Sequence, residues 1–261
     1  MVIKSSLLAH VNDKTAFEEL SRLLDLVDIA IEQNRIRTSH FLDPYHAALA
    51  EGVLRGISGI NYLFSGGYPE AERKRLVVGP DYLTESQLNP EIVYLRLTGQ
   101  SLNTLSHRDY LGAILAIGIK REVLGDILVL PESCQVILDQ EVAKFVDIHL
   151  QRVHKIPVSV EIHQLDNIEI PAVKTKQIKA TIASLRLDSV AATGFGVSRS
   201  KISKEIMGQR VRLNWKPETN TSALVSEGDL VSCRGRGRVI VKEVGNKSKK
   251  GRLHVILERI M

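Results

Sequence analysis

Two short helix-forming segments followed at once by a strand define the stretch RLDSVAATGFGVSRSKISKEIMGQRVRLNW, residues 186–215. Gly194 or Gly196 can end the first helix, because glycine readily adopts the left-handed conformation that closes helices. Ile202 and Ile206 lie four residues apart and give the second helix an apolar side. The stretch therefore predicts a compact unit of two short helices and a strand.

Polar residues and glycines mark the ends of these two helices. Asp188 is expected to cap the first helix and Ser198 the second, because a short side-chain oxygen can accept hydrogen bonds from the free amides of a first turn. Gly208 suits the left-handed position after the second helix. Both helices thus carry their own start and stop signals.

Cations crowd around this unit. Alternation in RVRLNW (210–215) places Arg210, Arg212 and Asn214 on one side of the strand, and the apolar residues on the other. Backbone amides at a helix start and nearby guanidinium groups together suit a phosphate. The candidate nucleic-acid contacts in this part of the chain are Arg186, Ser198, Arg199, Lys201, Lys204, Arg210, Arg212, Asn214, Lys216, Arg234, Arg236 and Arg238.

The charge is divided unevenly along the chain. Residues 1–173 carry 16 Lys and Arg against 23 Asp and Glu, whereas residues 174–261 carry 19 against 7. A basic third joined to an acidic remainder is typical of a polyanion-binding module on a scaffold, because clustered cations gain most from counterion release. A solvated basic face is the alternative, and charge alone does not separate the two.

Composition excludes several other classes of protein. No apolar run approaches the roughly 20 residues of a membrane helix, and charge appears too early at the N-terminus for a secretory signal. Cys134 and Cys233 are far apart in the sequence, which favours neither a disulfide framework nor a zinc site. We expect a cytoplasmic, monomeric protein of 261 residues that binds no membrane, metal or cofactor.

The first segment, residues 1–75, is expected to be helical. Apolar residues recur at three- and four-residue spacing from residue 13 onward, and a second run begins at Pro44, with Asp43 as its cap. The segment ends in the basic cluster Arg73, Lys74 and Arg75. In an acidic half of the chain this cluster is either a solvated helix face or a second RNA contact, and the sequence leaves both open.

The spacing of apolar residues changes in residues 76–170, where short strand-like segments alternate with helical ones. Helices are expected at HRDYLGAILAI and QEVAKFVDIHLQRV, and strands at RLVVG, IVYLRLTG, DILVL, CQVILD and VSVEIHQL. This order predicts a ferredoxin-like or RRM-like α+β domain with helices on one face of a mostly antiparallel sheet. Residues 166–179 are expected to form a linker to a third domain, residues 180–261.

That third domain has a specific resemblance. The stretch 186–215, followed by VSEGDLVSCRGRGRVIV (225–241), resembles an S4 RNA-binding domain: RLD opens one helix, SR the next, and a glycine, a V-x-VN-like strand and GD follow. Trp215 departs from the pattern, because glycine commonly follows the asparagine, so a wider hairpin is expected. The matching positions are Arg186, Leu187, Asp188, Ser198, Arg199, Gly208, Val211, Asn214, Gly228 and Asp229.

The resemblance extends to the whole chain. SGGYPEAERKR (65–75) and HRDYLGAILAIGIKREVLGDILV (107–129), taken with the C-terminal module, resemble the YlmH-type S4 proteins, which in photosynthetic lineages are described as photosystem II S4 domain proteins. The resemblance implies RNA binding through the S4 domain and association with the large ribosomal subunit near peptidyl-tRNA. It also implies a role in ribosome-associated quality control, cell division or photosystem assembly.

Structured RNA is the expected ligand, and we expect no catalytic activity. The module lacks a long recognition helix for the DNA major groove, and it is poor in aromatic residues for stacking single strands. Trp215 is expected to be buried. The enzymatic alternative is a pseudouridine synthase, whose RLD aspartate would be Asp188, and a third reading is a protein-binding adaptor. His149, His154 and His163 have no metal-binding spacing.

Overall fold

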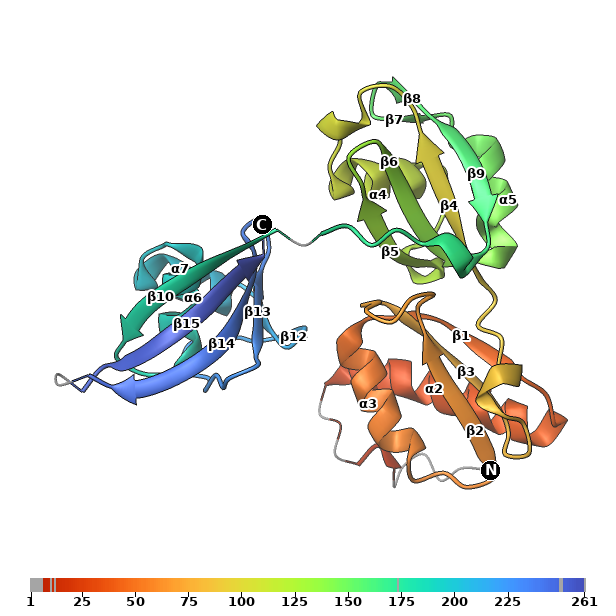
Figure 1. Cartoon of the computed structure of the whole chain (residues 1–261). Coiled ribbons are helices and arrows are strands. Elements are labelled where there is room, and N and C mark those ends of the chain that lie inside the picture. Colours follow the sequence, from red (N-terminus) through yellow and green to blue (C-terminus); the bar gives the residue numbers. More distant parts are fainter. Residues whose placement is uncertain (1–6, 10, 12, 173, 249–250, 261) are drawn as a thin grey trace. The chain divides into compact units, whose positions relative to one another are not determined.

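The computed structural model divides into two compact units, residues 1–171 and 172–261 (Figure 1). The first unit contains an N-terminal part and a central part, each with its own sheet and hydrophobic core. The second unit is built on a single larger sheet. The structure describes residues 7–9, 11, 13–172, 174–248 and 251–260.

The N-terminal part contains the two expected helices. Helix α2 (Lys14–Gln33) begins at Asp13, whose carboxylate accepts from the amides of the first turn, and α3 (Pro44–Leu54) begins at Asp43, which accepts from the His46 amide at 3.0 Å. Their apolar sides pack on strand β3 (Lys74–Pro80) through one core. The Asp43 cap was therefore identified correctly from the sequence, whereas Asp13 had not been predicted as a cap.

Three strands in this part correct the prediction of a helical segment. Strands β1 (Arg37–Leu42) and β2 (Ile60–Ser65) flank β3 in an antiparallel sheet of order β1-β3-β2. The RLVVG strand belongs to this sheet and not to the central one, so the boundary expected after residue 75 falls inside β3. Neither β1 nor β2 alternates clearly, and both are fixed by pairing with the distant β3.

The central part has the predicted ferredoxin-like fold, in the order β-α-β-β-α-β, without the RLVVG strand that the sequence placed at its start. Its sheet has the order β5-β6-β4-β9, all antiparallel, and α4 and α5 pack on one face through a common core. A small hairpin, β7–β8, precedes the last strand. The elements are β4 (Ile92–Thr98), α4 (His107–Ala116), β5 (Leu124–Val129), β6 (Ser133–Asp139), α5 (Gln140–His149), β7 (Arg152–Val153), β8 (Ile156–Pro157) and β9 (Ser159–His163). Single 3-10 turns occur at η1 (Glu85–Gln87), η2 (Leu102–Thr104), η3 (Arg121–Val123) and η4 (Leu165–Asn167).

The second face of the central sheet is covered. Phe41 of β1 packs against Tyr94 and Ile137 in a shared cluster, and Tyr94 and Ile137 are 1% and 0% exposed. The hydroxyl of Tyr94 donates to the carbonyl of Asn167 at 3.2 Å, and the amide of Glu169 donates to the buried Gln135 at 3.0 Å. The sheet is therefore closed on both faces, by helices on one and by the N-terminal part and residues 165–169 on the other.

The second unit places two helices on one face of a six-stranded sheet of order β10-β15-β14-β13-β11-β12 (Figure 1). Gly194 packs so closely on β14 that a Cβ atom there would lie 2.7 Å from Val239. The sequence assigned residues 166–179 to a linker, but residues from Thr175 onward form edge strand β10, because they pair along the whole of β15. The elements are β10 (Thr175–Ile182), α6 (Leu187–Phe195), α7 (Arg199–Met207), β11 (Val211–Leu213), β12 (Lys216–Pro217), β13 (Leu230–Cys233), β14 (Gly237–Lys247) and β15 (Leu253–Ile260).

Candidate nucleic-acid interface

Asp188 joins the two helices of the second unit. Its carboxylate, on a residue only 4% exposed, accepts from Arg199 at 2.7 Å and from Arg186 at 3.2 Å and 3.3 Å. Burial raises the pKa of Asp188, but the hydrogen bonds from Arg199 and Arg186 outweigh it, so the net pKa is lowered. The predicted cap is thus wrong: Asp188 lies inside α6, and Arg186 occupies the cap position without a side-chain bond.

Helix α7 presents cations to solvent. Ser198 caps it as predicted, because its hydroxyl accepts from the Lys201 amide at 3.3 Å. Ile202 and Ile206 are fully buried in the core, while Lys201 and Lys204 are exposed. The helix therefore has the predicted division into one apolar and one cationic side. Gly196 ends α6 in the left-handed region, with φ 65°.

The hairpin after α7 is tighter than expected. Leu213 pairs directly with Lys216, so Asn214 and Trp215 form a two-residue turn with φ of 49° and 64°. The Asn214 amide group donates to Asp229 at 2.8 Å and accepts from the Leu230 amide at 2.9 Å, which holds the turn against the next strand. The expectations of a wide hairpin and of an alternation reaching Trp215 are both wrong.

Three residues around this turn differ from what the sequence predicted. Gly208 has an ordinary φ of −82°, and Gln209 takes the left-handed position, with φ 56°. Trp215 is half-buried, lies outside the hydrophobic clusters of the described residues, and keeps an indole N–H without a partner there. Asn214 was predicted to contact RNA, but its amide is occupied within the fold.

Four cations remain exposed on the strands and turns that follow α7: Arg210, Arg212, Lys216 and Arg234. Arg210 and Arg234 lie side by side, because the backbone amide of Arg234 donates to the carbonyl of Arg210 at 2.9 Å. Arg212 lies on β11, between the buried Val211 and the half-buried Leu213. The pairing of β11 with β13 therefore brings distant cations next to those that follow α7.

Arg236 and Arg238 are less accessible than the sequence suggested. Arg236 forms a two-pronged ion pair with Glu205 of α7, at 2.8 Å and 2.9 Å. Hydrogen bonds from Arg236 and from the Cys233 thiol lower the pKa of Glu205 to about 2. Arg236 thus ties α7 to the β13–β14 turn, so its prediction as a free RNA contact is not supported. Arg238 is half-buried on β14.

The basic cluster at residues 73–75 faces inward. Arg75 is 5% exposed, forms an ion pair with Asp139 at 3.0 Å and donates to the carbonyl of Ser39 at 2.7 Å. Arg73 donates to the carbonyls of Phe41 and Leu124, and burial lowers its pKa. Both readings offered by the sequence are therefore wrong for these two arginines, which join the N-terminal and central parts. Lys74 is half-buried.

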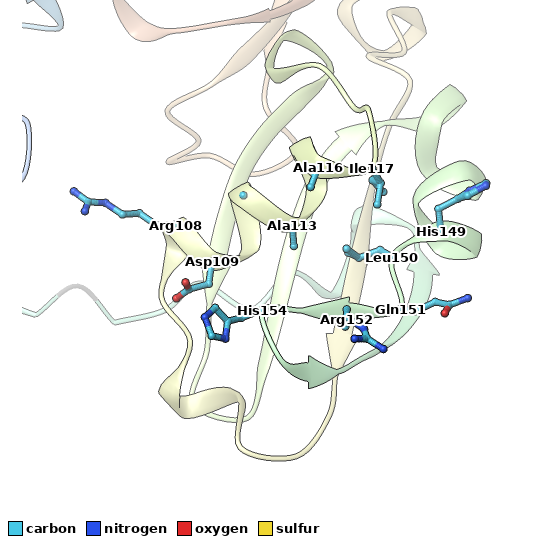
Figure 2. A pocket seen from close by; sticks show the side chains of 11 residues that line it. Arg108, Asp109, Ala113, Ala116, Ile117, His149, Leu150, Gln151, Arg152 and His154 are labelled. Carbon is cyan, nitrogen blue, oxygen red and sulfur yellow. The ribbon is translucent and has the colours of Figure 1, made fainter.

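A concave surface of about 550 Å³ lies on the helical side of the central part, where the sequence predicted no site (Figure 2). Its floor consists of small or apolar residues of α4 and the end of α5, and Arg108, His149, Arg152 and His154 surround it. The one sequence signal for this surface was the pair His149 and His154, which were considered as metal ligands. Among the described residues, no group of three or more His, Cys, Asp or Glu is placed to hold a metal ion.

Three family models match successive parts of the chain. The N-terminal YlmH model matches residues 15–83, the model described as "Putative RNA-binding domain in YlmH" matches 91–167, and the S4 domain model matches 185–231. No helix among the described residues is long and apolar enough to cross a membrane. The first two matches lie within the first compact unit, and the S4 match lies within the second.

A relative and a solved structure are similar over most of their lengths. The ribosome-associated protein quality control protein P2 of Bacillus subtilis (strain 168) is 35% identical over 248 residues, which cover 95% of each chain. The solved structure of the cell division protein ylmH from Streptococcus pneumoniae covers 60% of this chain and 96% of its own, with a TM-score of 0.52 and 21% identity. At that identity the second match shows the fold alone.

Proposed function

Because this chain belongs to the YlmH family of S4 RNA-binding proteins, we propose that it binds structured RNA of the large ribosomal subunit through its S4 domain, without catalysing a reaction. The name of the relative, a ribosome-associated protein quality control protein, supports a ribosomal setting for this chain. A cytoplasmic location close to peptidyl-tRNA completes the proposal. Ribosomal RNA and the tRNA are the proposed partners.

One observation carries the proposal: α7 and β11 each bury apolar side chains in the core, and their cations are exposed to solvent. Lys201 and Lys204 project from a helix whose other side is buried, and Arg212 projects from a strand between Val211 and Leu213. An RNA backbone is a regular array of phosphates, which such cations can neutralise with release of counterions. Because phosphates carry no base identity, this surface favours shape over sequence.

The environment of Asp188 supports a binding role over catalysis. A pseudouridine synthase would use the RLD aspartate at an accessible site, but the Asp188 carboxylate is buried and engaged by two arginines. We expect RNA from cells that carry Asp188→Asn to keep its full set of pseudouridines, as measured by mass spectrometry of RNA digests. Loss of a single pseudouridine would favour the enzymatic alternative.

A charge-matched pair of double variants tests the RNA surface. Lys204→Ala/Arg212→Ala removes two cations near α7, and Lys176→Ala/Lys179→Ala removes two exposed cations from β10, at the opposite edge of the sheet. Binding of the full chain to purified large ribosomal subunits is measured against salt concentration. The first variant should flatten the slope of log affinity against log salt by roughly 1.4 to 1.8, the share of two phosphates.

The β10 variant should change that slope much less, because its cations are on the other edge strand. Equal losses in the two variants would mean that only net charge matters, and the S4 surface would then have no special role. Wild-type binding in the α7 variant would contradict the proposal outright.

A further inference from the structure

The central part of the chain matches an RNA-binding model, yet its charge does not favour RNA. Residues 91–167 contain 7 Lys and Arg and 10 Asp and Glu. A polyanion is attracted by local groups of cations, and a domain with a negative total must concentrate them if it is to bind RNA. The question is therefore where in this fold unpaired cations gather.

The sheet face, which RRM domains use to stack bases on aromatic side chains, is closed here. Tyr94 is on that face but is 1% exposed, stacked on His163 with ring centres 5.2 Å apart. Its neighbour Gln135 is 0% exposed and accepts a hydrogen bond from the chain that covers it. RNA that binds this part must therefore use another surface.

Three of the seven Lys and Arg residues at positions 91–167 are engaged within the fold. Arg96 pairs with Glu169 at 3.5 Å, and Lys120 pairs with Glu122 at 3.6 Å. Arg121 donates to backbone carbonyls at 2.9 Å and 3.0 Å, and burial lowers its pKa to about 10. Among the described residues 91–167, the cations left without such partners are Arg108, Lys144, Arg152 and Lys155.

Two of these four, Arg108 and Arg152, line the concave surface of Figure 2. Their side chains extend outward around a floor that includes Ala113, Ile117 and Leu150, with the His154 ring on one side and His149 on the other. The volume of about 550 Å³ lies within the usual range of ligand pockets. The surface thus combines an apolar floor with a cationic rim.

Polar groups at the rim are held in place. The His149 ring stacks on Phe145, with centres 4.1 Å apart, and its Nδ1 lies 2.8 Å from the Phe145 carbonyl. Asp109, a carboxylate in the lining, accepts from the Ser106 amide and hydroxyl at 2.8 Å and 2.7 Å, which fixes it at the start of α4. Among the described contacts, Asp109 accepts from Ser106 and forms no ion pair with Arg108 or Arg152. The two arginines therefore remain available to a phosphate.

We propose that this surface is a second RNA site that holds an unpaired nucleotide, with its base or sugar on the apolar floor and its phosphates at Arg108 and Arg152. The inference rests on the proposed function in that both sites engage one RNA. Stacking and phosphate contacts together are how proteins bind single-stranded nucleic acid, and here the His149 and His154 rings supply the flat surfaces. The site is on the helical side of the fold and not on its sheet.

The test uses the full chain and an oligouridine RNA that contains 4-thiouridine, cross-linked by light and mapped by mass spectrometry. We expect cross-links in peptides covering residues 107–117 and 149–155. Arg108→Ala/Arg152→Ala should abolish them and flatten the salt slope of binding by roughly 0.7 per arginine. Lys144→Ala is the matched control, because it removes an exposed cation of the same domain that does not line the surface.

A second variant fills the surface without removing charge. No atom lies within 4 Å of a Cβ built on Gly112 in α4, so Gly112→Leu adds a side chain to open space and also favours the helix. It should reduce the cross-links while the salt slope of the residual binding stays at its wild-type value. A melting curve checks that each variant is folded.

The outcomes separate this inference from the proposed function. Cross-links confined to residues 172–261, or unchanged in both surface variants, overturn the second site and leave the S4 proposal standing. Cross-links at residues 107–117 that disappear in Arg108→Ala/Arg152→Ala support the second site, even if Lys204→Ala/Arg212→Ala binds ribosomal subunits normally. In that last case it is the S4 proposal that fails.

Discussion

Two basic clusters in this chain differ in their exposure to solvent. Arg73 and Arg75 come from a run of three consecutive cations, and Arg199 and Arg212 come from a looser group of five cations within 14 residues. The denser pair is internal and the other pair is exposed. The difference lies in what surrounds them. Arg75 meets a carboxylate and three backbone carbonyls, whereas Arg212 meets one carbonyl, at 3.5 Å. Cation density in a sequence therefore does not by itself indicate a binding surface.

Removing a guanidinium from the internal cluster should have the largest effect. Arg75→Ala leaves Asp139 as a buried, unpaired charge and unpairs the carbonyls of Ser39 and Pro90. We expect a loss of about 3–5 kcal/mol in the free energy of unfolding, measured by urea denaturation. Lys74→Ala, one residue away and half-buried, is the control and should lose far less. Equal effects would mean that the ion pair contributes little.

The Asp188 carboxylate comes next, because it connects α6 to α7, the helix that carries exposed cations. Asp188→Asn keeps the shape of the side chain but removes the charge that Arg186 and Arg199 share. We expect a loss of about 2 kcal/mol, the scale of hydrogen bonds to a charged group, whereas a helix cap would account for only about 1 kcal/mol. Thermal unfolding of the variant distinguishes these two values.

Glu205 makes a pH-dependent contribution of smaller size. Because Arg236 and Cys233 lower its folded pKa to about 2, the unfolded chain binds a proton more readily than the folded chain. The contribution is complete above about pH 4.5, the range of an unfolded glutamate, and is lost as the pH falls toward 2. Unfolding of Glu205→Gln, followed between pH 7 and 2, should show a shallower decline than wild type. A parallel decline would rule out this carboxylate as its source.

The exposed cluster should give the smallest change in stability. Arg212 is exposed and contributes no ion pair to the described fold, so Arg212→Ala should melt at the wild-type temperature. Its RNA affinity should fall almost equally for different RNA sequences, with a salt slope flatter by roughly 0.7 to 0.9. Ile202→Ala is the converse variant: it should cost about 2–4 kcal/mol through a core cavity and leave the slope of the folded fraction unchanged.

Local signals in the sequence were sufficient for the helices and for some of their caps. Asp43 and Ser198 cap as predicted, Gly196 closes its helix, and Ile202 and Ile206 are buried. Each of these features depends on residues within a few positions of one another. The family resemblance, carried by the same short motifs, is confirmed by the matching models and the relative.

Long-range pairing accounts for the elements that the sequence missed. Strand β10 resembles a lysine-rich linker in the sequence because all eight of its residues pair with β15, which lies far along the chain. The turn at Asn214 is tight, although Trp215 disfavours positive φ, because Asp229 and Leu230 hold it. In both cases the stabilising partner is distant in the sequence, so no local sequence pattern predicts the element.

The sequence by itself determined where most helices start, which side of α7 is buried, and which third of the chain is basic, because these depend on local backbone preferences and composition. Only the tertiary structure decided which cations face solvent. Carbonyls and carboxylates from other elements engage Arg73, Arg75 and Arg236. Arg108 and Arg152 line one surface only because β7 packs against α4. A charged group is exposed or engaged according to its spatial neighbours, and those are set by the fold.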